Sequence, residues 1–563
     1  MRTVNYSVDL CVVGGGMAGV CAAISAARHG AKVVLVQDRP VLGGNASSEV
    51  RMLIAGAHGK DNRETGILEE LECENYYINT GLKYSVWDAV LYGKVIEEKN
   101  ITLLLNTSCL DAVMDGKRIK SIKAWQSNAE TFHVIEASFF ADCSGDSILA
   151  PLTGAAYRYG REASGEFDES IAPEKEDKYT MGMSCILQAR QTDSKKTFIK
   201  PEWAYTYKTD DDFPYRKHMP IEKNNYWWIE LGGMGDCLHG VNEYQPELIK
   251  IALGVWDHIK NQADHGADNW ELEWIGLIPG KRESRRYVER YIINENDVRS
   301  EGKFPDVVAY GGWTMDDHFP EGFYYNKGTS TIWHPAPSPW GIPFRALYAK
   351  DIENLLFAGR NVSVTHVALS SIRVMATCAL MGQAIGTAAA EMVRSGTTPD
   401  TVDIKALQDT LMDDDCYLPG FKREPKTPTR VAKITNEVLR DGIDRGDEHS
   451  AVFEIGESAE YTFDTPTRVS GARFIFDSNL NREGWHMPKN YLLNEPNFKP
   501  SKTMTRDFDV ELTLADGTKK LIEVKNNRTR LCRVPVNEVV TAVRFTPRAS
   551  FGENVRVFSF ELY

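Results

Sequence analysis

Three closely spaced glycines, Gly14, Gly16 and Gly19, form the clearest chemical motif of the chain. An apolar run at residues 8–13 precedes them, small residues follow, and a second apolar run covers residues 32–36. A G-x-G-x-x-G pattern within a strand–helix–strand unit of about thirty residues is typical of a dinucleotide-binding fold. Gly14 permits a sharp turn, Gly16 leaves room for a pyrophosphate, and Gly19 lets the helix pack against the strands.

The residue after the second apolar run departs from the usual pattern. An acidic residue commonly binds the ribose hydroxyls there, whereas this chain has Gln37 followed by Asp38. An amide also donates and accepts hydrogen bonds, so we interpret Gln37 as a neutral replacement. The alternative is a glycine-rich turn that binds no ligand. The first part of the expected cofactor site is Gly14, Gly16, Met17, Ala18, Gly19, Gln37, Asp38 and Arg39.

Further motifs follow in order along the chain. Residues 39–48 resemble the segment after the second strand in glutathione-reductase-type and succinate-dehydrogenase-type flavoproteins. Residues 139–146 resemble the mid-chain strand and turn of that superfamily, and residues 354–361 resemble its C-terminal flavin-contacting strand. With residues 363–390, the set resembles the FAD-dependent oxidoreductase family that also contains the flavin subunit of heterodisulfide reductases. The resemblance implies FAD as the cofactor, and it adds Gly43, Gly44, Asn45, Ser144, Gly145, Gly359, Arg360 and Gln383 to the expected site.

Flavin chemistry needs groups that move a proton and stabilise charge on the reduced ring. His366 is the candidate for the proton, because imidazole titrates near neutral pH and the resemblance implies that its turn approaches the flavin. Arg373 is the candidate partner of the flavin pyrimidine edge. The alternatives are a histidine bonded to backbone and an arginine in a structural salt bridge. His58 is a third candidate, either facing the substrate or carrying a covalent flavin.

Other polar residues have a weaker claim. Residues 280–286, GKRESRR, form a basic cluster in an acidic protein. We favour a solvated or salt-bridged helix start over an anchor for a carboxylate or sugar hydroxyls. We interpret His318 and His334, the latter in a predicted loop at 332–335, as ordinary loop residues rather than catalysts.

The predicted fold class is α/β: a Rossmann-like FAD-binding domain, an inserted α+β substrate domain and a C-terminal all-β sandwich. Aromatic residues are dense in the inserted part, and short alternating runs separated by turn signals follow residue 430. The last two runs resemble the ends of discoidin-type, galactose-binding-like modules, some of which bind sugars and others only pack. The expected division is 1–154 and 341–411 for the FAD-binding domain, 155–340 for the substrate domain, 412–430 for a linker and 431–563 for the sandwich.

Composition excludes several classes of protein. The 563 residues, 42% hydrophobic and 26% charged, describe a globular chain of two or three domains. A net charge of −14 argues against nucleic-acid binding. No apolar stretch approaches about eighteen residues and no leader pattern is visible, so we expect a cytoplasmic protein without a membrane span. Ten cysteines without a C-x-x-C pair predict neither an iron–sulfur cluster nor another metal site. The oligomeric state, including a homo-oligomer, is left open.

These observations predict an FAD-dependent oxidoreductase that transfers a hydride from a small organic donor to flavin N5. The aromatic residues and the sandwich favour a carbohydrate-derived donor. No second glycine motif suggests a pyridine-nucleotide site, and the electron acceptor is unspecified. The alternatives are a redox-neutral FAD-dependent lyase or isomerase, and a carbohydrate-binding protein with a relic FAD domain.

Overall fold

The computed structural model describes residues 1–219, 225–494, 499–552 and 554–563. The chain forms two compact units, each assembled from segments that are distant in sequence. Unit 1 comprises Met1–Ala57, Lys83–Val402 and Gly484–Pro496, and unit 2 comprises His58–Leu82, Asp403–Glu483 and Asn497–Tyr563. The five-part division at residues 154, 340, 411 and 430 stays a prediction.

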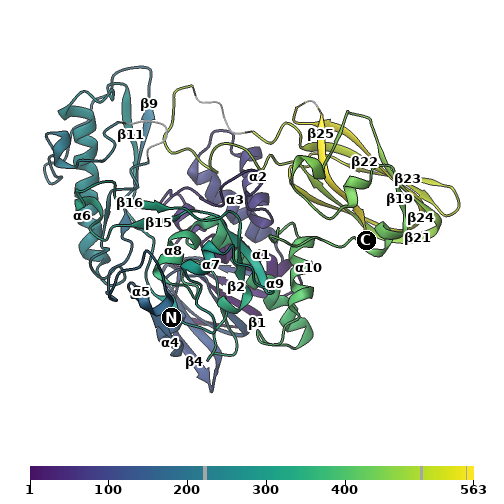
Figure 1. Ribbon diagram of the computed structural model, residues 1–563, viewed down its shortest axis with the longest axis horizontal. Coiled ribbons are helices and arrows are strands. Elements are labelled where there is room, and N and C mark those ends of the chain that lie inside the picture. The colour runs from purple at the N-terminus through teal and green to yellow at the C-terminus, as the bar shows by residue number, and fades with distance from the viewer. Residues whose placement is uncertain (220–224, 495–498, 553) are drawn as a thin grey trace. The chain divides into compact units, whose positions relative to one another are not determined.

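A seven-stranded sheet forms the centre of unit 1 (Figure 1). Its order is β3 (Ile101–Leu104), β2 (Val33–Val36), β1 (Arg2–Val13), β6 (Thr131–Asp142), β5 (Arg118–Gln126) and β4 (Thr107–Asp115), with β18 (Leu355–Phe357) also paired to β6. Strands β1, β2, β3, β6 and β18 are parallel, and the antiparallel β4 and β5 form a hairpin. The carboxyl ends of the parallel strands therefore meet at one edge, where α/β sheets bind their ligands.

Strand β6 is paired along one side by β1 over its whole length. On its other side, residues 131–136 pair with β5 and residues 140–142 pair with β18. The hairpin of β4 and β5 and the strand β18, which lies in the motif at residues 354–361, thus share one long strand.

Two helices of small residues pack beside this sheet. In α1 (Met17–Arg28), every residue up to Ala27 is buried, and α1 packs against α9 (Met375–Ser395). A Cβ at Gly382 would lie 2.0 Å from the carbonyl oxygen of Ala18, and one at Gly386 would lie 2.2 Å from that of Ala22. The glycines therefore set how closely the two helices approach.

Short sheets and helices make up the rest of unit 1. The sheets are β8 (Met183–Ser184) with β10 (Glu230–Leu231) and β12 (Gly280–Lys281), β7 (Tyr157–Arg158) with β13 (Arg286–Tyr287), β9 (Leu187–Gln191) with β11 (Trp270–Ile275), β14 (Val307–Gly311) with β17 (Trp340–Pro343), and β15 (Met315–His318) with β16 (Thr331–His334). The helices are α3 (Tyr84–Glu97), α4 (Leu149–Thr153), α5 (Ser164–Phe167), α6 (Val241–Asp257), α7 (Glu295–Arg299) and α8 (His366–Ile372). The prediction of a loop at residues 332–335 was wrong for its first three residues, because Met315–Asp317 supplies a partner strand that sequence pattern alone does not identify.

Unit 2 contains α2 (Ile67–Ile78), α10 (Ile404–Asp413), α11 (Thr427–Val431) and the β-strands of the C-terminal region. The strands are β19 (Lys433–Ile434), β20 (Ala451–Phe453), β21 (Ala459–Phe476), β22 (Thr505–Leu514), β23 (Lys519–Val524), β24 (Leu531–Ser550) and β25 (Val555–Leu562). The long strands β21 and β24 pair through register shifts, β25 adds to the end of β21, and β22 adds to β24. Phe474, Phe508, Phe545 and Phe560 fill the core, and the expected all-β sandwich is confirmed.

The chain bends between α8 and α9. Among the described residues, no single helix combines the length and the apolar character of a membrane span. The two helices pass that test only as a pair bent by 91°.

The close contact of α1 with α9 makes a testable prediction about stability. Gly386→Ala should lower the free energy of unfolding by about 1–3 kcal/mol, because its methyl group would overlap the Ala22 carbonyl. Gly93→Ala, within α3 and with no atom within 4 Å of the added carbon, should instead raise it by about 0.5–1 kcal/mol. Denaturant unfolding of the two variants measures both effects, and equal stabilities would contradict the packing argument.

Candidate functional site

A cavity of about 820 Å³ opens at the carboxyl edge of the parallel strands. Its volume lies in the upper part of the roughly 300–1,000 Å³ range of cofactor and small-molecule sites. Of the residues expected from the sequence, it is lined by Gly14, Gly16, Met17, Ala18, Gln37, Asp38, Arg39, Gly43, Gly44, Asn45, Ser144, Gly145, Gly359, Arg360 and Arg373. The structure therefore brings together motifs that span most of unit 1.

The glycine motif shapes one end of the cavity as a cradle for a phosphate group. Gly14 has φ of 104°, and a Cβ there would lie 2.5 Å from the Cys143 carbonyl oxygen. At Gly16 the nearest atom to an added Cβ is 3.9 Å away, so this position is open. Gly16 is the N-cap residue of α1, and the helix has neither a side-chain cap nor an acidic residue in its first turn. The first N–H groups of α1 thus fit the pyrophosphate of a dinucleotide.

The end of β2 provides a different arrangement from the usual acidic residue. The Gln37 Oε1 accepts a hydrogen bond from the Gly15 N–H at 2.7 Å, and its Nε2 donates to the Val41 carbonyl at 3.0 Å. Gln37 therefore fixes the glycine loop, while the exposed Asp38 also lines the cavity. Arg39 lines it too and pairs with Glu49 at 3.3 Å.

A network of charges follows the end of β6. Asp146 accepts from the Lys281 ammonium at 2.9 Å and from the Arg360 guanidinium at 2.6 Å. Burial alone would raise the pKa of the Asp146 carboxyl, but Arg360 and Lys281 hold it well below its ordinary value. Arg360 also lies against Gly145, where an added Cβ would be 3.0 Å from its Nε. The charge of Arg360 is thus balanced within the protein.

A second row of alternating charges lies at the cavity, where Arg282, Asp316, His318 and Arg373 line it. Arg373 Nη2 donates to Asp316 Oδ2 at 3.2 Å, and His318 Nε2 lies 3.5 Å from the same carboxylate oxygen. His318 Nδ1 lies 2.8 Å from Glu230, which also pairs with Arg282 at 3.2 Å. Burial would raise the pKa of the Glu230 carboxyl, but Arg282 and His318 lower it. Burial would also raise the pKa of the Asp316 carboxyl, but His318 and Arg373 lower that pKa. Both carboxyl groups are therefore ionised.

The hairpin of β15 and β16 explains this arrangement. In the register of the two strands, Asp316 lies opposite Trp333, and His318 lies opposite Thr331. The four side chains therefore share one face of the hairpin. Asp316, His318 and Trp333 line the cavity, while Asp317 points to the opposite face.

Four indole rings also line the cavity. Trp227 and Trp333 lie edge to face at 6.3 Å between ring centroids, and Trp313 and Trp485 do so at 6.4 Å. The Lys489 ammonium lies 5.3 Å from the centre of the Trp485 ring. Trp485 and Lys489 come from the late segment that begins at Gly484 and belongs to unit 1.

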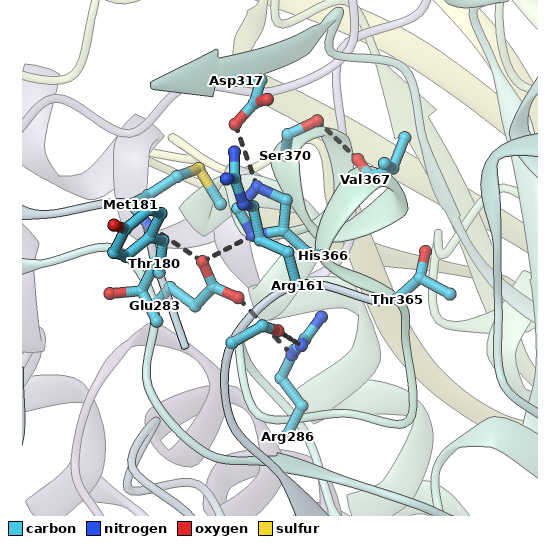
Figure 2. Close-up of polar contacts among 12 residues, drawn as sticks. Arg161, Thr180, Met181, Glu283, Arg286, Asp317, Thr365, His366, Val367 and Ser370 are labelled. Carbon is cyan, nitrogen blue, oxygen red and sulfur yellow. Dashed lines mark hydrogen bonds and ion pairs between the residues drawn. The ribbon is translucent and has the colours of Figure 1, made fainter. Parts of the chain in front are cut away.

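His366, the expected proton-transfer residue, does not line the cavity. Figure 2 shows its ring between Glu283, 2.8 Å from Nδ1, and Asp317, 3.0 Å from Nε2. Its backbone N–H donates to Glu162. Burial favours the neutral ring, but Glu283 and Asp317 raise the pKa of His366 to about 10. The imidazole is therefore a buried cation with both nitrogens engaged.

Three other expected residues also lie outside the lining of the cavity. Gly19 lies in α1 against the turn at Gly14, and a Cβ at Gly19 would overlap the Gly14 carbonyl oxygen. This close contact is the packing role expected for the third glycine. Gln383 is buried in α9. His58 is exposed and belongs to unit 2. Their roles in cofactor binding and catalysis remain predictions.

Sequence reasoning undervalued the polar side of the cavity. The carboxylates of Asp316 and Glu230 lie beside His318. The Asp-Asp-His run at residues 316–318 was the one feature of the sequence that indicated a carboxylate near this histidine. Lys281 and Arg282 of the basic cluster are paired and line the cavity. Trp485 lies in a stretch that was predicted to belong to the sandwich. The run Trp-His-Met-Pro lacks the alternation of a β-strand, and this was the available signal that the stretch does not belong to the sandwich.

The sheet, the glycine cradle and the cavity define a dinucleotide-binding flavoprotein. The chain belongs to the FAD dependent oxidoreductase family, whose model matches residues 9–411. It is therefore an FAD-dependent oxidoreductase with a Rossmann-like FAD-binding domain. The glycine cradle and the residues that follow β2, β6 and β18 line one cavity and fit FAD, which they would hold when it is bound.

The chain is similar to parts of several known proteins. A 40-residue stretch is 60% identical to the fumarate reductase (cytochrome) of Shewanella frigidimarina, and it covers 7% of this chain and 7% of that protein. A geranylgeranyl bacteriochlorophyll reductase-like protein from Thermoplasma acidophilum is 11% identical, with 73% of this chain and 84% of that chain covered and a TM-score of 0.33. A family 32 carbohydrate-binding module from Streptococcus pneumoniae is 15% identical, with coverages of 25% and 99% and a TM-score of 0.19.

Because Gly16 has open space beside it, a substitution there should weaken FAD binding without changing the stability of the protein. Gly16→Ala should leave the unfolding temperature of the flavin-free protein unchanged, because no atom lies within 3.9 Å of the new methyl group. It should weaken FAD binding at least about tenfold, or 1.4 kcal/mol, because the methyl group occupies the cradle. Fluorescence titration with FAD measures the affinity, with Gly93→Ala as the control. Unchanged FAD affinity would refute this placement of the pyrophosphate.

The charge on His366 predicts a dependence of stability on pH. The folded pKa of about 10 exceeds the ordinary 6.5, so stabilisation by the charged ring is complete below pH 6.5 and is lost as the pH rises through about 10. His366→Gln should destabilise the protein by about 3–5 kcal/mol at pH 7, because two buried carboxylates lose their partner.

Unfolding midpoints of the wild type and His366→Gln between pH 6 and pH 10.5 test this. The wild-type midpoint should fall more steeply across that window than the midpoint of the variant. His133→Gln is the control, since burial lowers rather than raises the pKa of His133. Parallel curves for wild type and His366→Gln would show that the ring is not charged in the folded protein.

Proposed function

We propose that the protein oxidises a hydroxyl-bearing carbon of a small, carbohydrate-derived donor by hydride transfer to its flavin. When bound, FAD supplies the hydride acceptor. The observation that carries the proposal is that one cavity contains both the glycine cradle and a wall of indole rings and buried charged groups. A substrate can therefore be held beside the cofactor.

The indole rings support a carbohydrate-derived donor. Trp227, Trp333 and Trp485 offer large apolar surfaces that suit the C–H face of a sugar ring. Arg373, Asp316 and the other polar groups of the same cavity can bind hydroxyl groups. A few polar groups among aromatic walls are the usual way in which a pocket fixes both affinity and orientation.

His318 suits the role of proton acceptor. Glu230 lies at hydrogen-bond distance from Nδ1, so we assign the uptake of the substrate proton to the other ring nitrogen, Nε2. The 3.5 Å between Nε2 and Asp316 is too long for a good hydrogen bond, so a substrate hydroxyl can be accommodated at Nε2. The donor carbon loses a hydride and its hydroxyl loses a proton to His318, so an alcohol becomes a carbonyl compound.

The paired arginines have supporting roles. Arg282 and Arg373 keep Glu230 and Asp316 ionised and so hold the imidazole between two carboxylates. The Arg373 Nε has no hydrogen-bond partner among the described residues. We assign this N–H to the substrate or to the edge of the flavin, as the sequence suggests for Arg373.

Anaerobic absorbance spectroscopy of the FAD-loaded protein tests the proposal. Sugars, polyols and hydroxy acids are added in turn, with NADPH as a comparison. We expect one class of hydroxyl compound to bleach the flavin. His318→Gln should slow this reduction about 10²–10⁴-fold with FAD still bound, because it removes the proton acceptor. His334→Gln, on the neighbouring strand but outside the cavity lining, should reduce at the wild-type rate.

Two results would contradict the proposal. A bound flavin that no hydroxyl compound reduces would exclude this class of donor and favour the redox-neutral alternative. Unchanged reduction of His318→Gln would exclude His318 as the proton acceptor while leaving the donor class intact.

Trp485→Ala tests the contact with the donor independently, since it should raise the donor's dissociation constant more than it lowers the limiting rate of reduction.

A further inference from the structure

Three histidines and an aspartate gather in unit 1, outside the lining of the cavity. Asp210 lies in a short 3₁₀ turn (Asp210–Asp212), and His218 follows it by eight positions. His258 is the first residue of a π-helical turn (His258–Gln262) that continues α6, and His265 lies just beyond that turn. Isolated π-helical turns are frequent at functional sites.

Five of the six separations among the four ligand-type atoms are between 3.0 and 3.7 Å, and all four atoms lie within 4.8 Å of one another. His258 Nε2 is 3.0 Å from His218 Nδ1, 3.1 Å from His265 Nε2 and 3.1 Å from Asp210 Oδ1. Asp210 Oδ1 is in turn 3.3 Å from His265 Nε2 and 3.7 Å from His218 Nδ1. A tetrahedral ion with bonds of about 2.0–2.1 Å has ligands about 3.3 Å apart. The observed separations bracket this value.

Hydrogen bonding alone does not account for this arrangement. His258 Nδ1 lies 3.1 Å from the Tyr207 carbonyl oxygen, which can only accept, so Nδ1 carries a proton. In the neutral ring, Nε2 can accept an N–H from His218 or His265, but its lone pair also faces the Asp210 oxygen at 3.1 Å, and these two acceptors repel each other. In the charged ring, the single N–H at Nε2 would be shared between Asp210 and the two other imidazoles. A cation at the centre satisfies every one of these groups.

The surroundings hold the imidazoles in place as they do around metal ions. The bond from His258 Nδ1 to a backbone carbonyl is the usual outer contact that fixes the tautomer and orientation of a metal-binding histidine. The buried Phe213 stacks on the His218 ring at 4.4 Å and meets the His258 ring edge to face at 4.9 Å. Asp257 accepts hydrogen bonds from Asn261 and Gln262 and so stabilises the π-helical turn.

We propose that Asp210, His218, His258 and His265 bind one Zn²⁺ ion in tetrahedral geometry. Three neutral imidazoles and one carboxylate suit this ion, and the protein supplies all four ligands, which is typical of a structural site. Binding requires deprotonated ligands, so it releases any protons that the imidazoles carry.

The proposed ion would stabilise one wall of the cavity from outside. It ties residues 210–218 to the end of α6. In the same segment, Arg216 donates to the carbonyl oxygens of Gly322, Tyr325 and Gly328. Those residues join β15 to β16, the hairpin that carries His318 and Trp333. Loss of the ion should therefore loosen the hairpin that carries the polar wall.

Metal analysis of the full-length protein, purified without a polyhistidine tag, tests the site. After removal of metal with a chelator, the protein is titrated with Zn²⁺ and, separately, with Co²⁺. We expect one equivalent of Zn²⁺ per chain, an increase in the unfolding midpoint on its addition, and the intense red-region absorption of tetrahedral Co²⁺ beyond the flavin bands. Failure of the wild type to bind Zn²⁺ would overturn the proposal.

Ligand variants make the test specific. Asp210→Asn and His265→Gln should each weaken Zn²⁺ binding more than about a hundredfold, since loss of an outer contact alone costs about 10–100-fold. The Asp210 side chain is 61% exposed, so its variant is expected to fold. The control is His239→Gln, which changes a histidine paired with Asp236 at 2.6 Å on the surface and should bind Zn²⁺ like the wild type. Equal Zn²⁺ binding by His265→Gln and His239→Gln would overturn the proposal.

Discussion

The backbone contact between α1 and α9 is the constraint on which the cofactor end of the cavity depends. The absence of side chains at Gly382 and Gly386 lets the second helix approach the carbonyl oxygens of the first. Both helices begin at the cavity, where Met17 and Met375 line it. Two motifs that are more than three hundred residues apart in sequence are thereby fixed against each other. This packing, together with the N–H groups of α1, preorganises the pyrophosphate position before any ligand binds.

The part of the cavity proposed to bind the substrate is held together by charged side chains rather than by close packing of small residues. The period of two in β15 sends Asp316 and His318 towards the cavity and Asp317 to the other face, where it meets His366. The His366 imidazolium therefore contacts this strand, through the Asp317 carboxylate, on the face away from the cavity. Removal of this buried cation would leave two carboxylates uncompensated.

The sequence predicts well what depends on local pattern. The glycine motif, the first strand and helix and the order of the FAD motifs follow from the spacing of small and apolar residues, and the structure places most of the expected cofactor residues on one cavity. Burial and distant partners are harder to predict. Glu283 and Asp317, which make His366 a buried cation, lie 83 and 49 positions away.

Distance in sequence also hides the other members of the site. The carboxylates that neutralise Lys281 and Arg282 come from Asp146 and Glu230, on segments that the sequence does not connect. Trp485 reaches unit 1 from a stretch surrounded by strands of unit 2, and no local pattern indicates which unit it joins. The spacing of Asp210, His218, His258 and His265 matches no common metal-binding motif, because a π-helical turn and a loop bring the four together.

The shared strand β6 has a consequence for biosynthesis. On the side away from β1, residues 140–142 pair with β18, which lies more than two hundred residues later in the chain. A nascent chain that ends before Leu355 therefore exposes an apolar strand edge containing Phe140 and Ala141, which is a template for pairing with another chain. The nucleotide domain cannot close its sheet during synthesis until the intervening region has left the ribosome. Truncated genes that stop within that region should thus yield aggregated rather than soluble fragments.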